Sequence, residues 1–269
     1  MHQIKMPVEK LNRITQSDKM SGSRIDQAIL EYAGLFILKN VIPAEVIGKY
    51  KQFYDDYKNS SDFDRTKFHL TEVRFPHAHA LASILDEPAF KEIAAGFFNG
   101  NVGLFSIRII KKDSIDDKPV FLHQDIGYQH GSFQRYSLFI PLTWCGERNG
   151  GLRFLPGTHR FGYLGDVGSI RDVVPAELAT MTPEVGPGDV IVMDSALWHT
   201  SNQNVSHDER IYYDIHINHA VDPATKKLIL GCGDDEWALD YSQEFLFDGS
   251  RTQRIVGLYK DLDAAKAGK

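Results

Sequence analysis

The chain is poor in cysteine, has no long apolar run and carries no excess of positive charge. Only Cys145 and Cys232 occur among 269 residues, too few for a disulfide framework, so both are interpreted as reduced thiols. No apolar stretch approaches membrane-spanning length, and the amino terminus lacks the apolar core of a signal peptide. A net charge of −6 argues against nucleic acid as a partner. These absences predict a cytoplasmic protein whose partner is neither a membrane nor a nucleic acid.

The composition is that of an ordinary globular protein, with 42% hydrophobic and 25% charged residues and no internal repeat. We therefore expect one domain over residues 1–269, of which about the first 100 residues are mostly helical. Residues 101–222 consist of short runs rich in β-branched and aromatic residues separated by turns, as in an antiparallel jelly roll. Residues 223–269 form a C-terminal extension. The predicted fold class is α+β with a mainly β core and N-terminal helices packed outside it.

Capping and turn residues predict the helices of the amino-terminal part. Ser23 is a candidate N-cap for a helix over residues 25–32, which Gly34 would end. Pro43 suits the first turn of a second helix with an apolar and aromatic stripe at helical spacing. A further helix is predicted over residues 88–98.

The most informative feature of the chain is the segment Phe121–Asp125. If this segment is a strand, the alternation of side chains places His123 and Asp125 on one face, where an imidazole and a carboxylate converge. A second histidine, His199, follows a predicted strand over residues 189–194. Two histidines and one carboxylate, with the remaining positions open, are the ligand set of non-heme Fe(II) oxygenases. These three residues are therefore the predicted Fe(II) ligands.

Arg210 lies eleven residues beyond His199, at the start of a strand-like run over residues 211–217. Its planar guanidinium can bind a carboxylate through two parallel hydrogen bonds. Beside an iron site, the predicted partner is the distal carboxylate of 2-oxoglutarate.

Taken together and in order, these motifs resemble the phytanoyl-CoA dioxygenase family of Fe(II)/2-oxoglutarate-dependent oxygenases. The motifs in chain order are His123-Gln124-Asp125, Asn149–Arg160, His199, Ser201 and Arg210. The resemblance runs from about residue 100 to about residue 220 and implies a double-stranded β-helix, a cupin-like jelly roll. It also implies that His123, Asp125 and His199 hold iron. Arg210 and Ser201 would hold 2-oxoglutarate, with O2 as the second cosubstrate.

The resemblance further implies an oxidoreductase that oxidises a C–H bond, in most cases by hydroxylation, and releases succinate and carbon dioxide. Related halogenases have a small residue at the carboxylate position, so Asp125 favours hydroxylation over halogenation. A small polar metabolite is the predicted substrate, and phytanoyl-CoA itself is disfavoured because no basic patch for its phosphates is evident. This prediction depends on polar and aromatic residues that follow the metal motif: Tyr128, Gln129, His130, Gln134 and Arg135.

Two other classes of protein stay open on the sequence alone. A cupin-like metal-dependent isomerase or epimerase would share the jelly roll and the histidines, but it would not require an arginine for a dicarboxylate or consume oxygen. A non-catalytic ligand-binding jelly roll is the second class, because a fold does not imply an activity. Such a protein would tolerate loss of the metal ligands, whereas all three are present here. The oligomeric state is not determined by the sequence.

Other basic residues compete for a role in the site. His77 and His79 have a metal-binding spacing, but no strand is evident there, so a surface or site-mouth position is favoured. His216 and His219 are three residues apart on a predicted strand, face opposite ways and are interpreted as core or surface residues. Lys111–Lys112 is interpreted as a solvated strand end.

Overall fold

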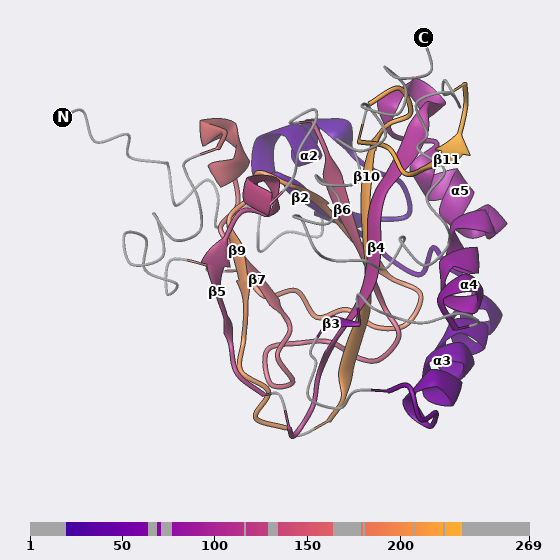
Figure 1. Cartoon of the computed structure of the whole chain (residues 1–269). Coiled ribbons are helices and arrows are strands. Elements are labelled where there is room, and N and C mark those ends of the chain that lie inside the picture. The colour runs from indigo at the N-terminus through magenta and orange to yellow at the C-terminus, as the bar shows by residue number, and fades with distance from the viewer. Residues whose placement is uncertain are drawn as a thin grey trace, which may run out of the picture.

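The structure is a computed structural model that describes residues 20–63, 69–70, 77–115, 117–128, 134–163, 179, 181–206, 208–222 and 224–232. Within these residues, an eight-stranded sheet and a three-stranded sheet lie face to face, and helices cover the outer face of the larger sheet (Figure 1). This is the predicted α+β architecture with a β-rich jelly-roll core and helices outside it.

The strands of the larger sheet come from distant parts of the chain, and every pair is antiparallel except β1 with β2. In spatial order they are β1 (Ser21–Gly22), β2 (Leu35–Leu38), β8 (Val190–Asp194), β6 (Tyr136–Pro141), β10 (Arg210–His219), β4 (Val102–Lys112) and β11 (Lys227–Leu230), with β3 (His69–Leu70) beside β4. The smaller sheet has the order β5 (Val120–His123), β9 (His199–Ser201) and β7 (Leu152–Phe154). The segments that carry the predicted metal ligands are thereby brought to one small sheet.

The helices follow the sequence signals with two corrections. They are α2 (Gln27–Ala33), α3 (Ala44–Lys58), α4 (His77–Ala82) and α5 (Pro88–Ala94), with 3₁₀ turns at Ser83–Asp86, Phe98–Gly100, Asp125–Tyr128 and Thr158–Phe161. Asp26, and not Ser23, is the N-cap of α2, because its carboxylate accepts from the backbone N–H of Ile29 at 3.1 Å. Gly34 ends α2 at φ 78°, as predicted. Helix α5 is shorter than predicted: it ends at Ala94, and a separate 3₁₀ turn follows at Phe98–Gly100.

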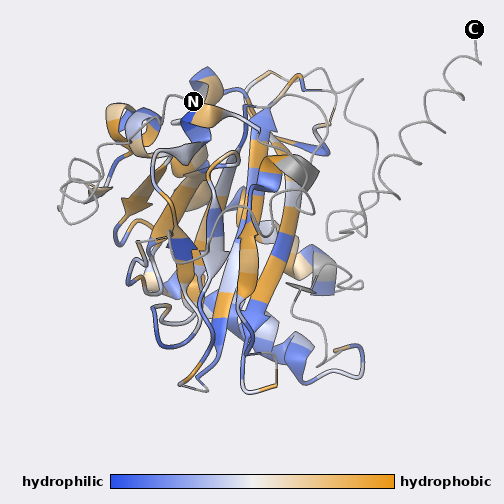
Figure 2. Cartoon of the chain, turned by 90° about the vertical axis from the view of Figure 1, so that its left-hand side faces the viewer, coloured by the Kyte–Doolittle hydropathy of each residue, from blue (hydrophilic) through white to orange (hydrophobic). Residues whose placement is uncertain are grey.

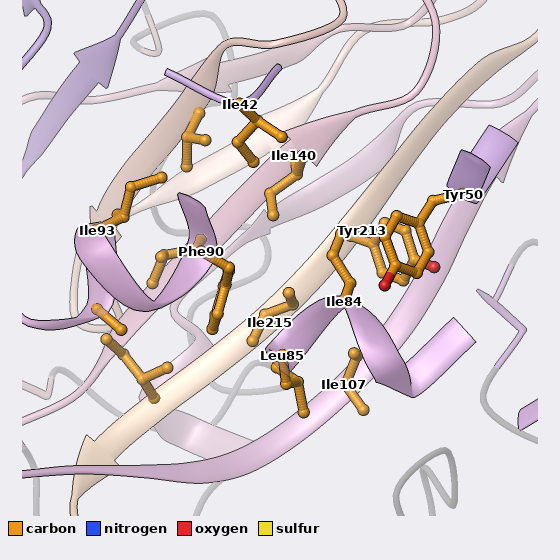
Figure 3. Close-up of a cluster of buried hydrophobic side chains, with 14 of the residues drawn as sticks. Ile42, Tyr50, Ile84, Leu85, Phe90, Ile93, Ile107, Ile140, Tyr213 and Ile215 are labelled. Atoms are coloured by element: carbon orange, nitrogen blue, oxygen red, sulfur yellow. The ribbon is translucent and has the colours of Figure 1, made fainter. Parts of the chain in front are cut away.

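The outer face of the larger sheet and the helices share one apolar core. Alternate residues of β10, beginning with Ile211 and Tyr213, belong to this core. The aromatic stripe of α3 packs onto it as predicted: the rings of Tyr50 and Tyr213 meet edge to face at 6.0 Å, while Phe90 of α5 lies over Ile215 (Figure 3). An aromatic pair of this kind contributes about 0.5–1.5 kcal/mol beyond its burial. This core therefore holds the central strands of the larger sheet in place from the side opposite the smaller sheet.

The inner face of the larger sheet is mixed in character. Apolar residues such as Phe139 and Ile191 pack with Phe154 of the smaller sheet. The inner positions of β10, in contrast, are buried and mostly polar: Arg210, Tyr212, Asp214, His216 and Asn218. The strands are accordingly mostly hydrophobic with isolated hydrophilic bands in Figure 2. Polar side chains in such a position require partners, because burying them without any is costly.

The prediction that Lys111–Lys112 is a solvated strand end is wrong. The two side chains are 0% and 2% exposed. Lys112 donates from Nζ to the carbonyl oxygens of Lys118 and Asn202, the latter at 2.6 Å, while Lys111 Nζ lies 2.8 Å from Asp113. A long aliphatic stem lets an ammonium reach such acceptors inside the fold. Lys112 thus joins the larger sheet to the end of β9.

No helix in the described part of the chain is long and apolar enough to cross a membrane.

Candidate metal centre

Strand pairing brings the two predicted histidine ligands together. His123 at the end of β5 lies directly opposite His199 at the start of β9. Side chains at directly opposite positions of antiparallel strands are near neighbours, and here the two imidazole rings are 4.2 Å apart between centroids. A cross-strand pair therefore supplies two ligands that are 76 positions apart in the sequence.

Asp125 reaches the same point by a different route from the predicted one. Strand β5 ends at His123, and Asp125 begins a 3₁₀ turn, so period-two alternation does not place its carboxylate. Between the two ligands, Gln124 is buried and donates from Nε2 to the carbonyl oxygens of Gly162 and Ala196, at 2.8 and 2.6 Å. This anchor fixes the bend of the chain. Asp125 Oδ1 then lies 3.6 Å from His123 Nε2 and 3.7 Å from His199 Nε2.

Both imidazoles are oriented by backbone carbonyl groups. His123 Nδ1 is 2.8 Å from the carbonyl oxygen of Phe121, and His199 Nδ1 is 3.0 Å from that of Leu197. A nitrogen facing a carbonyl oxygen carries the proton, which leaves the lone pair on Nε2. A hydrogen bond from the other ring nitrogen to a carbonyl oxygen commonly orients metal-binding histidines. The two Nε2 atoms and Asp125 Oδ1 therefore converge as three unprotonated donors.

The electrostatics of His199 and Asp125 favour their metal-binding protonation states. Burial and the neighbouring ring of His123 lower the pKa of His199 to about 4, so its imidazole is neutral at physiological pH. Burial alone would raise the pKa of Asp125, but the rings of His199 and His123 hold it well below its usual value. Neutral imidazoles and an ionised carboxylate are what a divalent metal requires.

Among the described residues, the structure brings one group of His, Cys, Asp and Glu side chains close enough to hold a metal ion. This group is His123, Asp125 and His199, whose ligand atoms lie within 4.8 Å of one another. The donor set fits Fe(II): two imidazoles and one carboxylate on one side, with no fourth protein ligand among them.

The competing pair, His77 and His79, lies on helix α4 and takes no part in this group. Positions two apart on a helix do not share a face. The ring of His77 instead packs against Tyr57 at 5.2 Å. The absence of a strand at this position is confirmed.

His216, predicted to be a core or surface residue, lies beside the metal ligand Asp125. It is 4% exposed and its Nε2 lies 4.0 Å from Asp125 Oδ2 and 2.9 Å from Asp214 Oδ1. Ser137 on β6, directly opposite His216 on β10, donates from its hydroxyl to Asp125 Oδ2 at 3.1 Å. No sequence motif predicts these contacts. The alternation of side chains along β10 does place His216 on the same face as Arg210, the inner face of the larger sheet.

The predicted cosubstrate residues lie on inner positions of the two sheets. Ser201 is two residues beyond His199 on β9, is buried, and accepts from the backbone N–H of Val120 at 3.3 Å. Arg210 opens β10 as predicted, is 2% exposed, and has its guanidinium 5.1 Å from the centre of the Tyr212 ring. In register it lies opposite Lys112, whose ammonium binds the carbonyl group of the residue after Ser201.

The polar residues that follow the metal motif, proposed as substrate contacts, differ in burial. Arg135 is fully buried, with Nη2 3.5 Å from Asp222 and its guanidinium 3.9 Å from the centre of the Phe105 ring. Gln134 is exposed. The other candidates, the side chain of Tyr128 and residues Gln129 and His130, lie outside the described residues.

A three-donor centre of two histidines and one carboxylate, set inside a jelly roll, is the ligand set of the non-heme Fe(II) oxygenases. The chain belongs to the phytanoyl-CoA dioxygenase family: the model of that family, described as Phytanoyl-CoA dioxygenase (PhyH), matches residues 30–212. The donor set of His123, Asp125 and His199 fits iron as the metal.

One curated relative and two solved structures are similar to this chain. The dioxygenase olcK of Penicillium canescens is 26% identical over an alignment of 207 residues, and the match covers 68% of this chain and 66%, just under two thirds, of that protein. The epimerase SnoN, in complex with Fe3+, alpha ketoglutarate and nogalamycin RO, superposes with a TM-score of 0.60 at 14% identity, over 80% of this chain and 86% of that one. EctD from S. alaskensis, with 2-oxoglutarate and 5-hydroxyectoine, gives a TM-score of 0.57 at 21% identity, over 72% and 74%. These structural likenesses show the fold.

Proposed function

We propose that the protein hydroxylates a C–H bond of a small polar metabolite, with conversion of 2-oxoglutarate and O2 to succinate and CO2. One oxygen atom enters the product and the other enters succinate, so no further reductant is needed. The observation that carries this proposal is the convergence of His123, Asp125 and His199 on one point inside the fold. When bound there, iron supplies the oxygen activation that protein side chains lack.

The metal ligands leave room for the cosubstrate. Iron held by these three protein donors would keep positions for the 1-carboxylate and 2-oxo oxygens of 2-oxoglutarate and for O2. The buried Arg210 supports binding of the distal carboxylate, because a guanidinium can hold it through two charge-assisted hydrogen bonds. Ser201 lies on the same side of β9 as His199, and its hydroxyl hydrogen can be donated to the same carboxylate.

A polar substrate agrees with the charged residues that the inner face of the larger sheet presents near the metal centre. Arg108 is paired with Asp214 at 2.5 Å, and its side chain is 28% exposed, whereas that of Asp214 is fully buried. Because this positive charge faces a carboxylate, the surroundings favour an uncharged polar molecule over a substrate with a net charge.

The name of SnoN bears on one alternative. SnoN is described as a non-heme alpha ketoglutarate dependent epimerase, so an epimerase can depend on this cosubstrate and can then require an arginine for its carboxylate. The retained carboxylate Asp125 still favours hydroxylation over halogenation in this chain.

The proposal is tested first without a substrate. Fe(II) and 2-oxoglutarate added under argon should produce the weak visible absorption band of the iron chelate, with one Fe(II) bound per chain. Neither a metal-dependent isomerase that does not use 2-oxoglutarate nor a non-catalytic jelly roll predicts this band. Its absence in metal-loaded protein would refute the assignment of the cosubstrate.

The second test identifies the outcome. Uncharged polar metabolites are screened for stimulated succinate formation, and the product of each hit is examined by mass spectrometry. Hydroxylation adds the mass of one oxygen atom to the product, whereas epimerisation leaves the mass unchanged. A protein in which Asp125 is replaced by glycine provides the contrast, since it lacks one metal ligand and opens a position to chloride. If chloride does not perturb the metal spectrum of that variant, the assigned position of Asp125 is wrong.

A further inference from the structure

We propose that Ser137 and His216 position Asp125 so that one of its carboxylate oxygens faces the metal and the other is held away from it. This role rests on the proposed function and concerns residues that are not metal ligands. Its purpose would be to keep a coordination position open for O2.

The two oxygens of Asp125 have different surroundings. Oδ1 faces the histidine pair, at 3.6 Å from His123 Nε2 and 3.7 Å from His199 Nε2. Oδ2 points to the larger sheet, where it accepts from the Ser137 hydroxyl at 3.1 Å and lies 4.0 Å from His216 Nε2. One oxygen is therefore available to a metal and the other is already hydrogen-bonded.

The Ser137 hydroxyl, which donates to Asp125 Oδ2, is also in contact with His216. Ser137 has one hydrogen, which it donates to Asp125, and its oxygen also lies 3.3 Å from His216 Nδ1. The other ring nitrogen of His216 lies 2.9 Å from Asp214 Oδ1, and Asp214 Oδ2 accepts from Arg108 Nε at 2.5 Å. The contacts thus form a line across three adjacent strands, β6, β10 and β4, and end at the carboxylate of Asp125.

This line is attached to a rigid part of the fold. Ser137 and His216 are directly opposite each other on β6 and β10, and His216 is opposite Ser106 on β4. The outer faces of these strands are fixed by the helical core described above. The register shift between His216 and Ile217 lies immediately beyond the site. Hydrogen bonds among backbone-fixed groups orient a ligand with little loss of side-chain entropy on binding.

The way in which Asp125 binds would determine how many coordination positions on the metal stay open. A carboxylate that used both oxygens would occupy one more coordination position on the metal. With 2-oxoglutarate taking two, none would remain for O2. The hydrogen bond to Oδ2 opposes that mode, because it would have to be broken first.

The experiment measures the open position directly. Nitric oxide binds Fe(II) where a position is free and gives a characteristic S = 3/2 electron paramagnetic resonance signal, so it is titrated into anaerobic protein containing Fe(II) and 2-oxoglutarate. Ser137→Ala should weaken nitric oxide binding by about tenfold, as expected for loss of one hydrogen bond to a charged group. Ser137→Thr, which keeps the hydroxyl, should restore most of the affinity.

Two further variants make the result specific. Ser195→Ala is the matched control, because Ser195 is also fully buried and its hydroxyl has no hydrogen-bond partner among the described residues. It should bind nitric oxide as the wild type does. His216→Gln should show a smaller loss than Ser137→Ala, and it serves in its place if the alanine variant does not fold.

The outcomes separate this role from the proposed function. If the wild type forms no iron and 2-oxoglutarate chelate, the proposed function fails and the positioning role fails with it. If the wild type forms the chelate and Ser137→Ala and His216→Gln both bind nitric oxide with wild-type affinity, the positioning role alone is refuted. Equal losses in Ser137→Ala and Ser137→Thr would also refute it, because the hydroxyl would then be irrelevant.

Discussion

Replacement of Arg210 by alanine is the sharpest test of the cosubstrate site. Arg210 is 2% exposed, so in the proposed complex its partner carboxylate is desolvated and would be left unpaired by the change. Removing one partner of a buried, hydrogen-bonded charge pair costs about 2–5 kcal/mol. At about 1.4 kcal/mol for each factor of ten, the affinity for 2-oxoglutarate should fall by roughly 30-fold to 4,000-fold. The neighbouring Lys112 limits the loss of positive charge, but its ammonium is already bound to two carbonyl groups.

The assay is an anaerobic titration of the Fe(II) protein with 2-oxoglutarate, followed by the visible chelate band. Iron affinity should stay at the wild-type value, because Arg210 is not among the three metal-binding residues. Arg210→Lys should recover only part of the affinity, since an ammonium supplies the charge but not the planar fork. Arg153→Ala is the control, because Arg153 donates instead to the carbonyl group of Ala179. Wild-type affinity for 2-oxoglutarate in Arg210→Ala would refute the assignment.

Three other perturbations test the metal centre, the buried thiol and the inner ion pair. His199→Ala should abolish stoichiometric Fe(II) binding measured by equilibrium dialysis, whereas His77→Ala should leave it unchanged; loss of iron from the latter would place the metal elsewhere. Burial raises the pKa of the Cys145 thiol to about 11, so alkylation near pH 8 should modify the exposed Cys232 and spare Cys145 until the protein is unfolded, and rapid double modification of folded protein would contradict this. Burial alone would raise the pKa of Asp214, but its charged neighbours lower it from 3.8 to about 2, so the pair stabilises the fold fully above pH 4 and loses roughly 2–3 kcal/mol as the pH falls from about 4 to about 2. Denaturant unfolding over this range should show that Asp214→Asn lacks this component, and an unchanged pH dependence would refute it.

The metal ligands could be predicted from the sequence because their chemistry is carried by residue type and order. Two histidines and an aspartate that flank predicted strands define a ligand set without knowledge of the exact bend of the chain. The reasoning from strand alternation was nevertheless incomplete, since Asp125 lies in a 3₁₀ turn. What holds that turn is the pair of hydrogen bonds from Gln124 to carbonyl groups of Gly162 and Ala196, which are distant in sequence.

The environment of the site could not be predicted in the same way. Lys112 was interpreted as solvated, yet its ammonium is buried because two carbonyl groups from other segments meet it. His216 was assigned to the core or the surface. Its proximity to Asp125 depends on β6 lying between β8 and β10, a strand order that side-chain alternation does not encode.

The sequence by itself determined the composition class, the helices with their aromatic stripe, the β-rich second part and the residue types able to bind iron. These properties follow from local periodicity and from the chemistry of single side chains. Only the tertiary structure decided which oxygen of Asp125 faces His123 and His199, and which side chains hold the other. That choice depends on the register of β5 with β9 and of β6 with β10, and register is fixed by packing between segments far apart in the chain.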